Sequence, residues 1–216
     1  MRRIGLAIVL TLSLLALGAP LATEAQAPPK EPRVGYLSIG SASDPRRVAI
    51  YEAFRQSLRD RGYIENRNIS IESRFAEGNY DQLPGLAAEL VRRRVDVIAA
   101  YSTPAAKAAL GATKSIPIVM SGVVDPVATG LVVGLARPGG NATGLSLMAP
   151  EIVGKQMQLL KELIPSVSRI AVLWNPTNPS GAPQLQEAEV AARALKVQLQ
   201  PRRHAVAMTS TRLSRQ

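Results

Sequence analysis

The stretch "VDVIAAYSTPAAKAAL", which runs from Val95 to Leu110, decides the fold class of this chain. It opens with a short apolar run, and an alanine-rich run with helical character begins directly after Thr103-Pro104. A strand that is covered on both faces has this apolar composition, and in a parallel sheet it is followed by a helix that returns the chain. The stretch therefore predicts a buried strand up to Tyr101 and a helix that begins at the carboxyl edge of a sheet.

Strand and helix patterns alternate on both sides of this stretch. Short apolar or alternating runs predict strands at residues 33–40, 69–75, 95–101, 116–121 and 142–148. Apolar residues at helical spacing predict helices between them, around residues 51–58, 83–91, 105–113 and 126–136. This order predicts an α/β fold with a doubly wound parallel sheet and helices on both of its faces.

A second, shorter α/β unit begins near Ala149-Pro150. It has helical stripes in residues 153–164 and 185–195, and strand patterns in residues 169–175 and 196–201. About two strands are too few for an independent domain, so we expect this unit to be incomplete. Residues 202–216 contain four arginines and one histidine, have no acidic residue and show no period, which predicts an aperiodic basic tail.

The first 27 residues predict a secretory signal peptide. Arginines precede an uncharged apolar run over residues 4–22, and the A-x-A pattern Ala25-Gln26-Ala27 follows it. The alternative is an uncleaved membrane anchor, because the run is nearly long enough to span a bilayer. A glycine and a proline in the run, together with the A-x-A pattern, favour cleavage after Ala27. The chain has no cysteine, which excludes disulfides and thiolate chemistry, and we expect an exported, periplasmic protein.

Composition and motifs argue against nucleic acid binding and against catalysis. The formal net charge is +10, but the arginines are scattered and aromatic residues are few, which indicates a solvated basic surface. The chain lacks a P-loop, a G-x-S-x-G elbow and a His/Asp/Glu cluster with metal-ligand spacing. Its one histidine, His204, lies in the tail. We therefore expect no enzyme activity, no metal and no cofactor.

Four predicted junctions between a strand and a helix share a pattern, an N-cap residue followed by proline. They are Asp44-Pro45, Thr103-Pro104, Asp125-Pro126 and Asn178-Pro179. The pattern is also ordinary helix punctuation, because proline is favoured at the first helical position. In a parallel sheet, however, such junctions lie at the carboxyl edge of the strands, where open α/β folds bind their ligands. The junctions therefore predict where a ligand site would lie.

The side chains at these junctions suit a small zwitterion such as an amino acid. Hydroxyls of Ser41, Ser102 and Thr103 can donate or accept hydrogen bonds, and a helix N-terminus attracts a carboxylate. Asp125 can accept from an ammonium group. The aromatic residues at or near strand ends, which belong either to the core or to a pocket wall, are Tyr36, Tyr101 and Trp174.

The blocks "STPAAKAA", "IPIVMSGVVDPVATGLVVGLARPGGNATGLS" and "ELIPSVSRIAVLWNPTNP" stand in this order within Arg33 to Pro201. They resemble the ABC transporter substrate-binding protein family, in the subgroup that includes tryptophan- and tyrosine-binding members. The resemblance implies a type I periplasmic-binding fold, in which two α/β lobes close on a small ligand, and a membrane permease as partner. It implies a first lobe at residues 33–147 and a second lobe at residues 148–201.

Carried over by motif, the resemblance implies that the Ser41, Ser102-Thr103 and Asp125 segments face the ligand cleft, together with Asn175. Tyr101 stands where such sequences often have a small residue, so it either narrows the pocket or stacks on a ligand. The resemblance stops at Pro201, where family members continue, and this departure suggests a truncated second lobe.

The function predicted from the sequence is thus the solute-binding component of an ABC importer, which binds a small polar or aromatic, amino-acid-like ligand. One alternative is a truncated remnant of such a protein that no longer retains ligand. The other is a hydrolase on the same fold, which would need a nucleophile or an acid–base pair that the sequence does not show.

Overall fold

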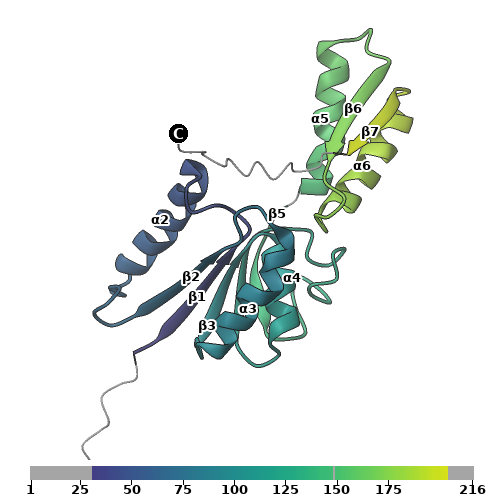
Figure 1. Cartoon of the computed structure of the whole chain (residues 1–216). Helices are drawn as coiled ribbons and strands as arrows, with labels where there is room; N and C mark the ends of the chain where they lie inside the picture. The colour runs from purple at the N-terminus through teal and green to yellow at the C-terminus, as the bar shows by residue number, and fades with distance from the viewer. Residues whose placement is uncertain (1–30, 148, 204–216) are drawn as a thin grey trace, which may run out of the picture. The chain divides into compact units, whose positions relative to one another are not determined.

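The computed structural model describes residues 31–147 and 149–203. The predicted signal peptide and His204 lie outside these ranges. Parallel strands form two sheets, one five-stranded with the order β2-β1-β3-β4-β5 and one two-stranded with β6 beside β7 (Figure 1). Within the described ranges, no helix combines the length and the apolar character that crossing a membrane requires.

The five-stranded sheet is built from strands and helices that alternate along the chain. Its strands are β1 (Arg33–Ser38), β2 (Ser70–Phe75), β3 (Val97–Tyr101), β4 (Ile118–Val124) and β5 (Ala142–Leu147). Its helices are α2 (Pro45–Arg59), α3 (Leu83–Arg92) and α4 (Thr103–Ala112), with the short 3-10 helix η1 (Tyr80–Gln82) before α3. The predicted doubly wound parallel sheet is confirmed.

Helices cover both faces of this sheet. Leu37 and Ile98 are fully buried in one cluster with apolar side chains of α3 and α4. Successive side chains of a strand point to opposite faces, so Tyr36 faces the other side. There the rings of Tyr51 and Phe54 from α2 lie 4.8 and 5.3 Å from the Tyr36 ring, measured between centroids. Figure 1 shows α3 and α4 together over the sheet, apart from α2.

The helix predicted at residues 126–136 is wrong, because this segment forms turns and bends between β4 and β5. The N–H groups of Leu131 and Val132 both donate to the carbonyl oxygen of Pro126, at 2.8 and 3.1 Å, which closes a single tight turn. Gly130 leaves helical geometry with φ +70°. A turn does begin at Pro126, but Gly130 ends it before a helix can propagate.

The pairing of β4 with β5 has an irregularity between Met120 and Val123. Two glycines accommodate it, Gly122 with φ +63° and Gly144 with φ +146°. A Cβ atom on Gly144 would overlap the carbonyl oxygen of Met120 and lie 2.7 Å from its carbonyl carbon. Glycine at position 144 therefore allows the two backbones to approach.

The second unit contains β6 (Arg169–Trp174), β7 (Gln198–Arg203), α5 (Ala149–Leu163) and α6 (Gly181–Ala194). Its buried core is small and consists of Met157, Ile170, Ala188, Ala192 and Val197. Helices cover one face of β6, where Ile170 is 8% exposed, whereas Leu173 is 72% exposed. β7 continues to Arg203, so Arg202 and Arg203 are strand residues, and the remainder of the predicted tail lies outside the described residues.

The pattern of an N-cap residue and proline marks a helix start at two of the four predicted junctions. Asp44 caps α2 as predicted, and α4 begins where expected, although Ser102 holds its N-cap position and Thr103 is the first helical residue. Asn178 does not cap α6, which begins three residues later at Gly181. Its Oδ1 instead accepts from the Ser180 N–H at 3.0 Å, in the turn that leads into the helix.

Candidate functional site

Three strand ends meet at the carboxyl edge of the five-stranded sheet. β3 lies between β1 and β4, and the register places Ser38 opposite Tyr101 and Tyr101 opposite Ser121. The predicted residues that follow these strand ends are Ser41, Ser102, Thr103 and Asp125. The structure therefore gathers them at one edge, although each has a different local environment.

Ser102 has the most strained backbone of this edge. Its φ is +96° and its ψ is 156°, a region that only glycine adopts without a cost of about 1–3 kcal/mol. Its N–H donates to the carbonyl oxygen of Ser121 at 2.9 Å, which fixes it beside β4. Its Oγ atom is buried and has no hydrogen-bond partner in the described part of the chain. Such strain and an unsatisfied buried hydroxyl are typical of functional positions.

The side chains of Thr103 and Asp125 both accept backbone hydrogen bonds that stabilise the fold. Thr103 is 2% exposed, and its Oγ1 accepts from the Val124 N–H at 3.0 Å, which fastens α4 to the end of β4. Asp125 has φ +37°, and its Oδ1 accepts from the Ala128 N–H at 2.9 Å. One carboxylate oxygen of Asp125 is thus engaged in the turn.

The loop after β1 is closed by local hydrogen bonds. The Ser41 Oγ lies 2.7 Å from the Ser43 Oγ and accepts from the Ser43 N–H at 3.0 Å. The Ala42 N–H donates to Glu77 Oε1 at 3.1 Å, which joins this loop to the segment after β2. The Ser41 hydroxyl is therefore already hydrogen-bonded within its own turn.

Tyr101 lies between a glycine and an arginine. A Cβ atom on Gly122 would lie 3.0 Å from Cε2 of the Tyr101 ring, so the ring rests on the Gly122 backbone. The guanidinium carbon of Arg47 lies 5.7 Å from the ring centroid, a cation–π distance. Because these neighbours occupy the ring, the geometry favours a Tyr101 that narrows the pocket over one that stacks on a ligand.

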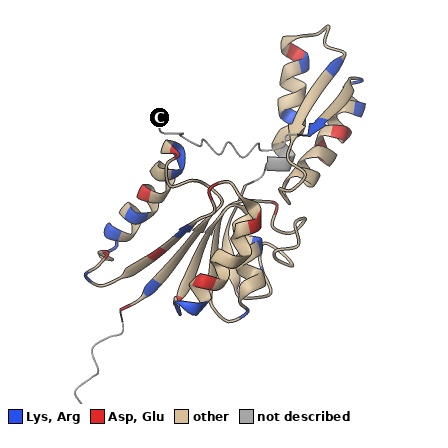
Figure 2. Ribbon diagram, viewed as in Figure 1, with Lys and Arg blue, Asp and Glu red and all other residues tan. Residues whose placement is uncertain are grey.

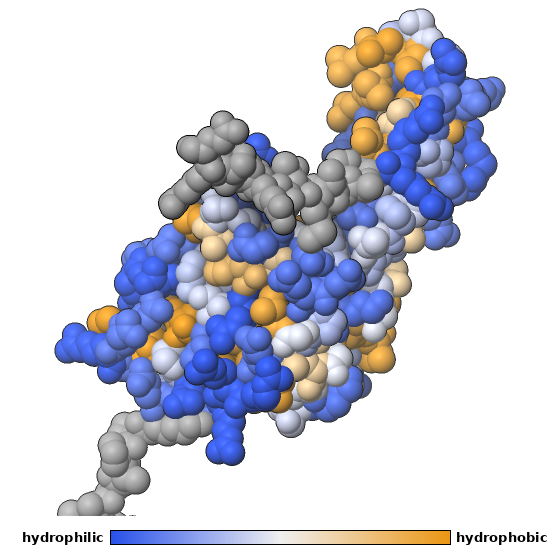
Figure 3. Space-filling view, in the orientation of Figure 1, coloured by the Kyte–Doolittle hydropathy of each residue, from blue (hydrophilic) through white to orange (hydrophobic). Residues whose placement is uncertain are grey.

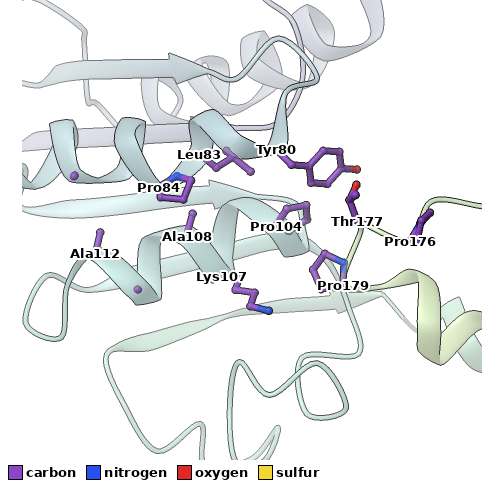
Figure 4. Close-up of a pocket in the computed structure, with 12 residues that line it drawn as sticks. Tyr80, Leu83, Pro84, Pro104, Lys107, Ala108, Ala112, Pro176, Thr177 and Pro179 are labelled. Carbon is purple, nitrogen blue, oxygen red and sulfur yellow. The ribbon is translucent and has the colours of Figure 1, made fainter. Parts of the chain in front are cut away.

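Asn175, the first residue after β6, hydrogen-bonds with Tyr80. Burial raises the pKa of the Tyr80 hydroxyl, while the hydrogen bond with Asn175 and the charge of Arg47 lower it. The Asn175 Oδ1 also accepts from the N–H and the hydroxyl of Thr177, at 2.9 and 2.8 Å. Figure 4 shows the Tyr80 and Thr177 side chains turned toward each other.

Tyr36 is a core residue rather than a pocket wall. It is 4% exposed, and burial, with smaller contributions from Tyr101 and Tyr51, raises the pKa of its hydroxyl to about 12. A hydrogen bond with Ser38 and the charge of Arg47 act in the opposite direction.

Sequence reasoning missed Arg47 and Tyr80. Tyr80 follows β2, so the rule that strand ends line the site would have included it. Arg47 lies one helical turn into α2, and nothing in its sequence neighbourhood indicates that its side chain reaches the end of β3.

An apolar cavity of about 610 Å³ begins beside the first turn of α4 and follows the seam between α3 and α4 (Figure 4). Its lining residues are Tyr80, Leu83, Pro84, Ala88, Pro104, Lys107, Ala108, Gly111, Ala112, Pro176, Thr177 and Pro179. None of the predicted site residues lines it. A zwitterion needs convergent polar groups. The cavity lining is mostly alanine, proline, glycine and leucine, with Tyr80, Lys107 and Thr177 as its polar members, whereas hydroxyls and a carboxylate follow three neighbouring strand ends at the edge. The strand edge is therefore the candidate site.

In the view of Figure 2, lysines and arginines are interspersed with acidic residues and do not form a continuous basic stripe. Among the described residues, no three His, Asp or Glu side chains are grouped in a way that would hold a metal ion. The polar groups of the strand edge are hydroxyls, amides, one arginine and isolated carboxylates, which are groups suited to hydrogen bonding with a small polar ligand.

The chain is similar to three proteins of known sequence or structure. A conserved domain protein of Vibrio cholerae is 31% identical with a TM-score of 0.75, over 81% of this chain and 58% of that one. A Streptococcus pneumoniae ABC domain solved in complex with L-Trp is 28% identical with a TM-score of 0.73, over 81% and 57%. A tyrosine-binding protein of Clostridioides difficile is 40% identical over 124 residues, which are 57% of this chain and 35% of that protein.

These similarities, with the parallel sheet order, define a substrate-binding protein of the type I periplasmic-binding fold. A leucine-binding protein of Thermotoga maritima, 12% identical with a TM-score of 0.60, shares this fold. The model of the ABC transporter substrate binding protein family matches residues 39–209, and the chain belongs to that family. The match extends past Pro201, so the family resemblance does not stop there as the sequence blocks indicated. The chain spans a little over half the length of the two similar structures.

Proposed function

We propose that this chain is the extracytoplasmic solute-binding component of an ABC importer, and that it binds an amino-acid-like ligand at the carboxyl edge of the five-stranded sheet. Family membership supports the class of function, and the relatives solved or named with tryptophan and tyrosine support the ligand class. Closure of a second lobe over the edge, followed by docking to a membrane permease, is the corresponding mechanism.

The observation that carries the proposal is the strained backbone of Ser102 together with its buried hydroxyl, which has no hydrogen-bond partner in the described part of the chain. A strained backbone and a buried hydroxyl without a partner both cost free energy, and a ligand that accepts from this hydroxyl recovers part of it. The first N–H groups of α4 lie beside it and favour an anionic group. We assign the ligand carboxylate to this position.

The remaining predicted residues take supporting roles in this proposal. The free oxygen of Asp125 accepts from the ligand ammonium group, and Tyr101 limits the depth of the pocket. Ser41 and Asn175 close the site from the loops after β1 and β6.

The test is calorimetric titration of the full chain with L-tryptophan, L-tyrosine and L-leucine, repeated for two Ser102 variants. Ser102→Ala removes the hydroxyl, and binding of the best ligand should weaken about tenfold, as expected for a hydrogen bond to a charged group. Ser102→Gly should weaken binding similarly but raise the free energy of unfolding by about 1 kcal/mol, because glycine relieves the strain.

Ser57→Ala, on the exposed face of α2, is the matched control and should bind as the unchanged protein does. A folded chain that binds none of the three amino acids would contradict the proposal and favour the alternative of a remnant that no longer retains ligand. If neither Ser102 variant changes the dissociation constant, the ligand does not bind at this edge.

A further inference from the structure

Arg47 lies in the first turn of α2 and is held at the strand edge by two contacts. A Cβ atom on Gly40 would lie 2.6 Å from its Cγ and 2.9 Å from its Cδ, so the aliphatic part of Arg47 rests directly on Gly40. Its guanidinium group lies over the ring of Tyr101, the residue immediately before Ser102. Both contacts hold the cation at the ends of β1 and β3.

The hydrogen-bond donors of Arg47 are largely unused. A guanidinium group that stacks on a ring by its face keeps its N–H donors directed outward in its own plane. In the described part of the chain, its one ion pair is with Asp44, where Nε and Oδ2 are 3.9 Å apart, too far for a hydrogen bond. The guanidinium group therefore has N–H donors that no described protein group accepts from, and its side chain is 37% exposed.

The position of Arg47 is also unfavourable for the helix that carries it. The first turn of a helix favours negative charge, yet the first turn of α2 contains Arg46 and Arg47 and no acidic residue. An anion that arrives at this edge is attracted by the arginine and by the helix dipole together. The carboxylate already present at this helix start is that of the N-cap residue Asp44, whose Oδ1 accepts from the Arg46 N–H at 3.0 Å.

The charge of Arg47 acts on more than one strand end. Burial raises the pKa values of Tyr36 and Tyr80, and in both cases the Arg47 charge opposes the effect of burial. The charge of Arg47 is therefore close enough to the Tyr36 and Tyr80 hydroxyls to lower the pKa of each.

We propose that Arg47 is a second anion-binding group of this strand edge, in addition to the Ser102 hydroxyl, and that it requires the ligand to carry a free carboxylate, which it binds with two parallel N–H donors. Arginine suits this role because its planar group matches a carboxylate in geometry, which a lysine does not. This inference rests on the proposed function, because it places the ligand at the same edge. It deepens that function by making the carboxylate, rather than the ammonium group, the required feature of the ligand.

The experiment compares four probes that differ in one group, which are L-tyrosine, 3-(4-hydroxyphenyl)propionate, tyramine and L-tyrosine methyl ester. Dissociation constants are measured by calorimetry for the unchanged chain and for Arg47→Ala, Arg47→Lys and Arg46→Ala. The unchanged chain should bind both carboxylates at least tenfold more tightly than tyramine and the ester. Arg47→Ala should abolish this preference by weakening the carboxylates alone, and Arg47→Lys should restore only part of it.

Arg46→Ala removes an equal charge from the same helical turn, and it should leave the preference unchanged. If L-tyrosine binds Arg47→Ala within twofold of the unchanged chain, the role of Arg47 is overturned while the proposed function stands. Equal loss in Arg46→Ala and Arg47→Ala would also overturn it, because net charge alone would then explain the effect. If none of the four probes binds the unchanged chain, both the inference and the proposed function for this ligand class fail.

Discussion

Tyr36 is the residue at which ionisation and folding are most clearly linked. Burial raises the pKa of its hydroxyl from 10.0 to about 12 in the folded chain. The folded state thus favours the protonated, neutral form. The stabilisation is fully present below pH 10, and it is lost as the pH rises toward 12, at about 1.4 kcal/mol per pH unit.

The variant Tyr36→Phe should therefore flatten the alkaline loss of stability. Urea unfolding midpoints at pH 9.0, 10.5 and 11.5 measure the effect, and the unchanged chain should lose more stability than the variant over this range. Some loss remains in the variant, because burial also raises the pKa of Tyr80. Tyr63→Phe is the control, since Tyr63 is 44% exposed, and an equal flattening by that variant would contradict the assignment to Tyr36.

At the scale of elements, the join between β4 and β5 depends on a single glycine. Gly144 has φ +146°, and a side chain there would overlap the backbone of Met120 on the neighbouring strand. Since the obstacle is backbone rather than a flexible side chain, the strands would have to separate. Gly144→Ala should lower the free energy of unfolding by about 3 kcal/mol or more, through backbone strain and the loss of strand pairing.

Gly140→Ala is the matched control for this prediction. It lies in the loop just before β5, and a Cβ atom there would have no neighbour within 4 Å. Its effect on the free energy of unfolding should be within about 1 kcal/mol of zero. Equal midpoints for the two alanine variants would show that the close approach of β4 and β5 contributes little.

The elements also show what the sequence could and could not predict. Apolar runs are local signals, so all seven strands were anticipated to within a few residues. The helix after Asp125-Pro126 was not a helix, because a proline start cannot reveal that Gly130 ends the turn. The strand ends could be predicted as the candidate site, which stays a prediction, whereas the strain of Ser102 and the position of Arg47 arise from contacts between residues distant in the chain.

At the scale of the molecule, the two sheets rest on cores of very different size. The five-stranded unit buries seventeen apolar residues in one cluster, and the two-stranded unit buries five. Several apolar side chains of the second unit are exposed, including Leu159, Leu163 and Leu173. Figure 3 shows a hydrophobic patch on this unit. Stability follows the apolar area that is buried, so the two units should differ in it.

The single tryptophan of the chain, Trp174, lies in β6 and therefore reports on the second unit alone, whereas far-UV circular dichroism reports on both. In urea, the fluorescence midpoint should come before the midpoint of the dichroism signal. Variants that enlarge cavities should then separate the two transitions. Ile170→Ala should lower the urea concentration at the fluorescence midpoint. Leu90→Ala, from the buried cluster of the first unit, should lower mainly the dichroism midpoint. Each substitution should reduce the free energy of unfolding of its own unit by about 2–5 kcal/mol. Coincident midpoints that both variants move together would instead mean that the two sheets unfold as one cooperative unit.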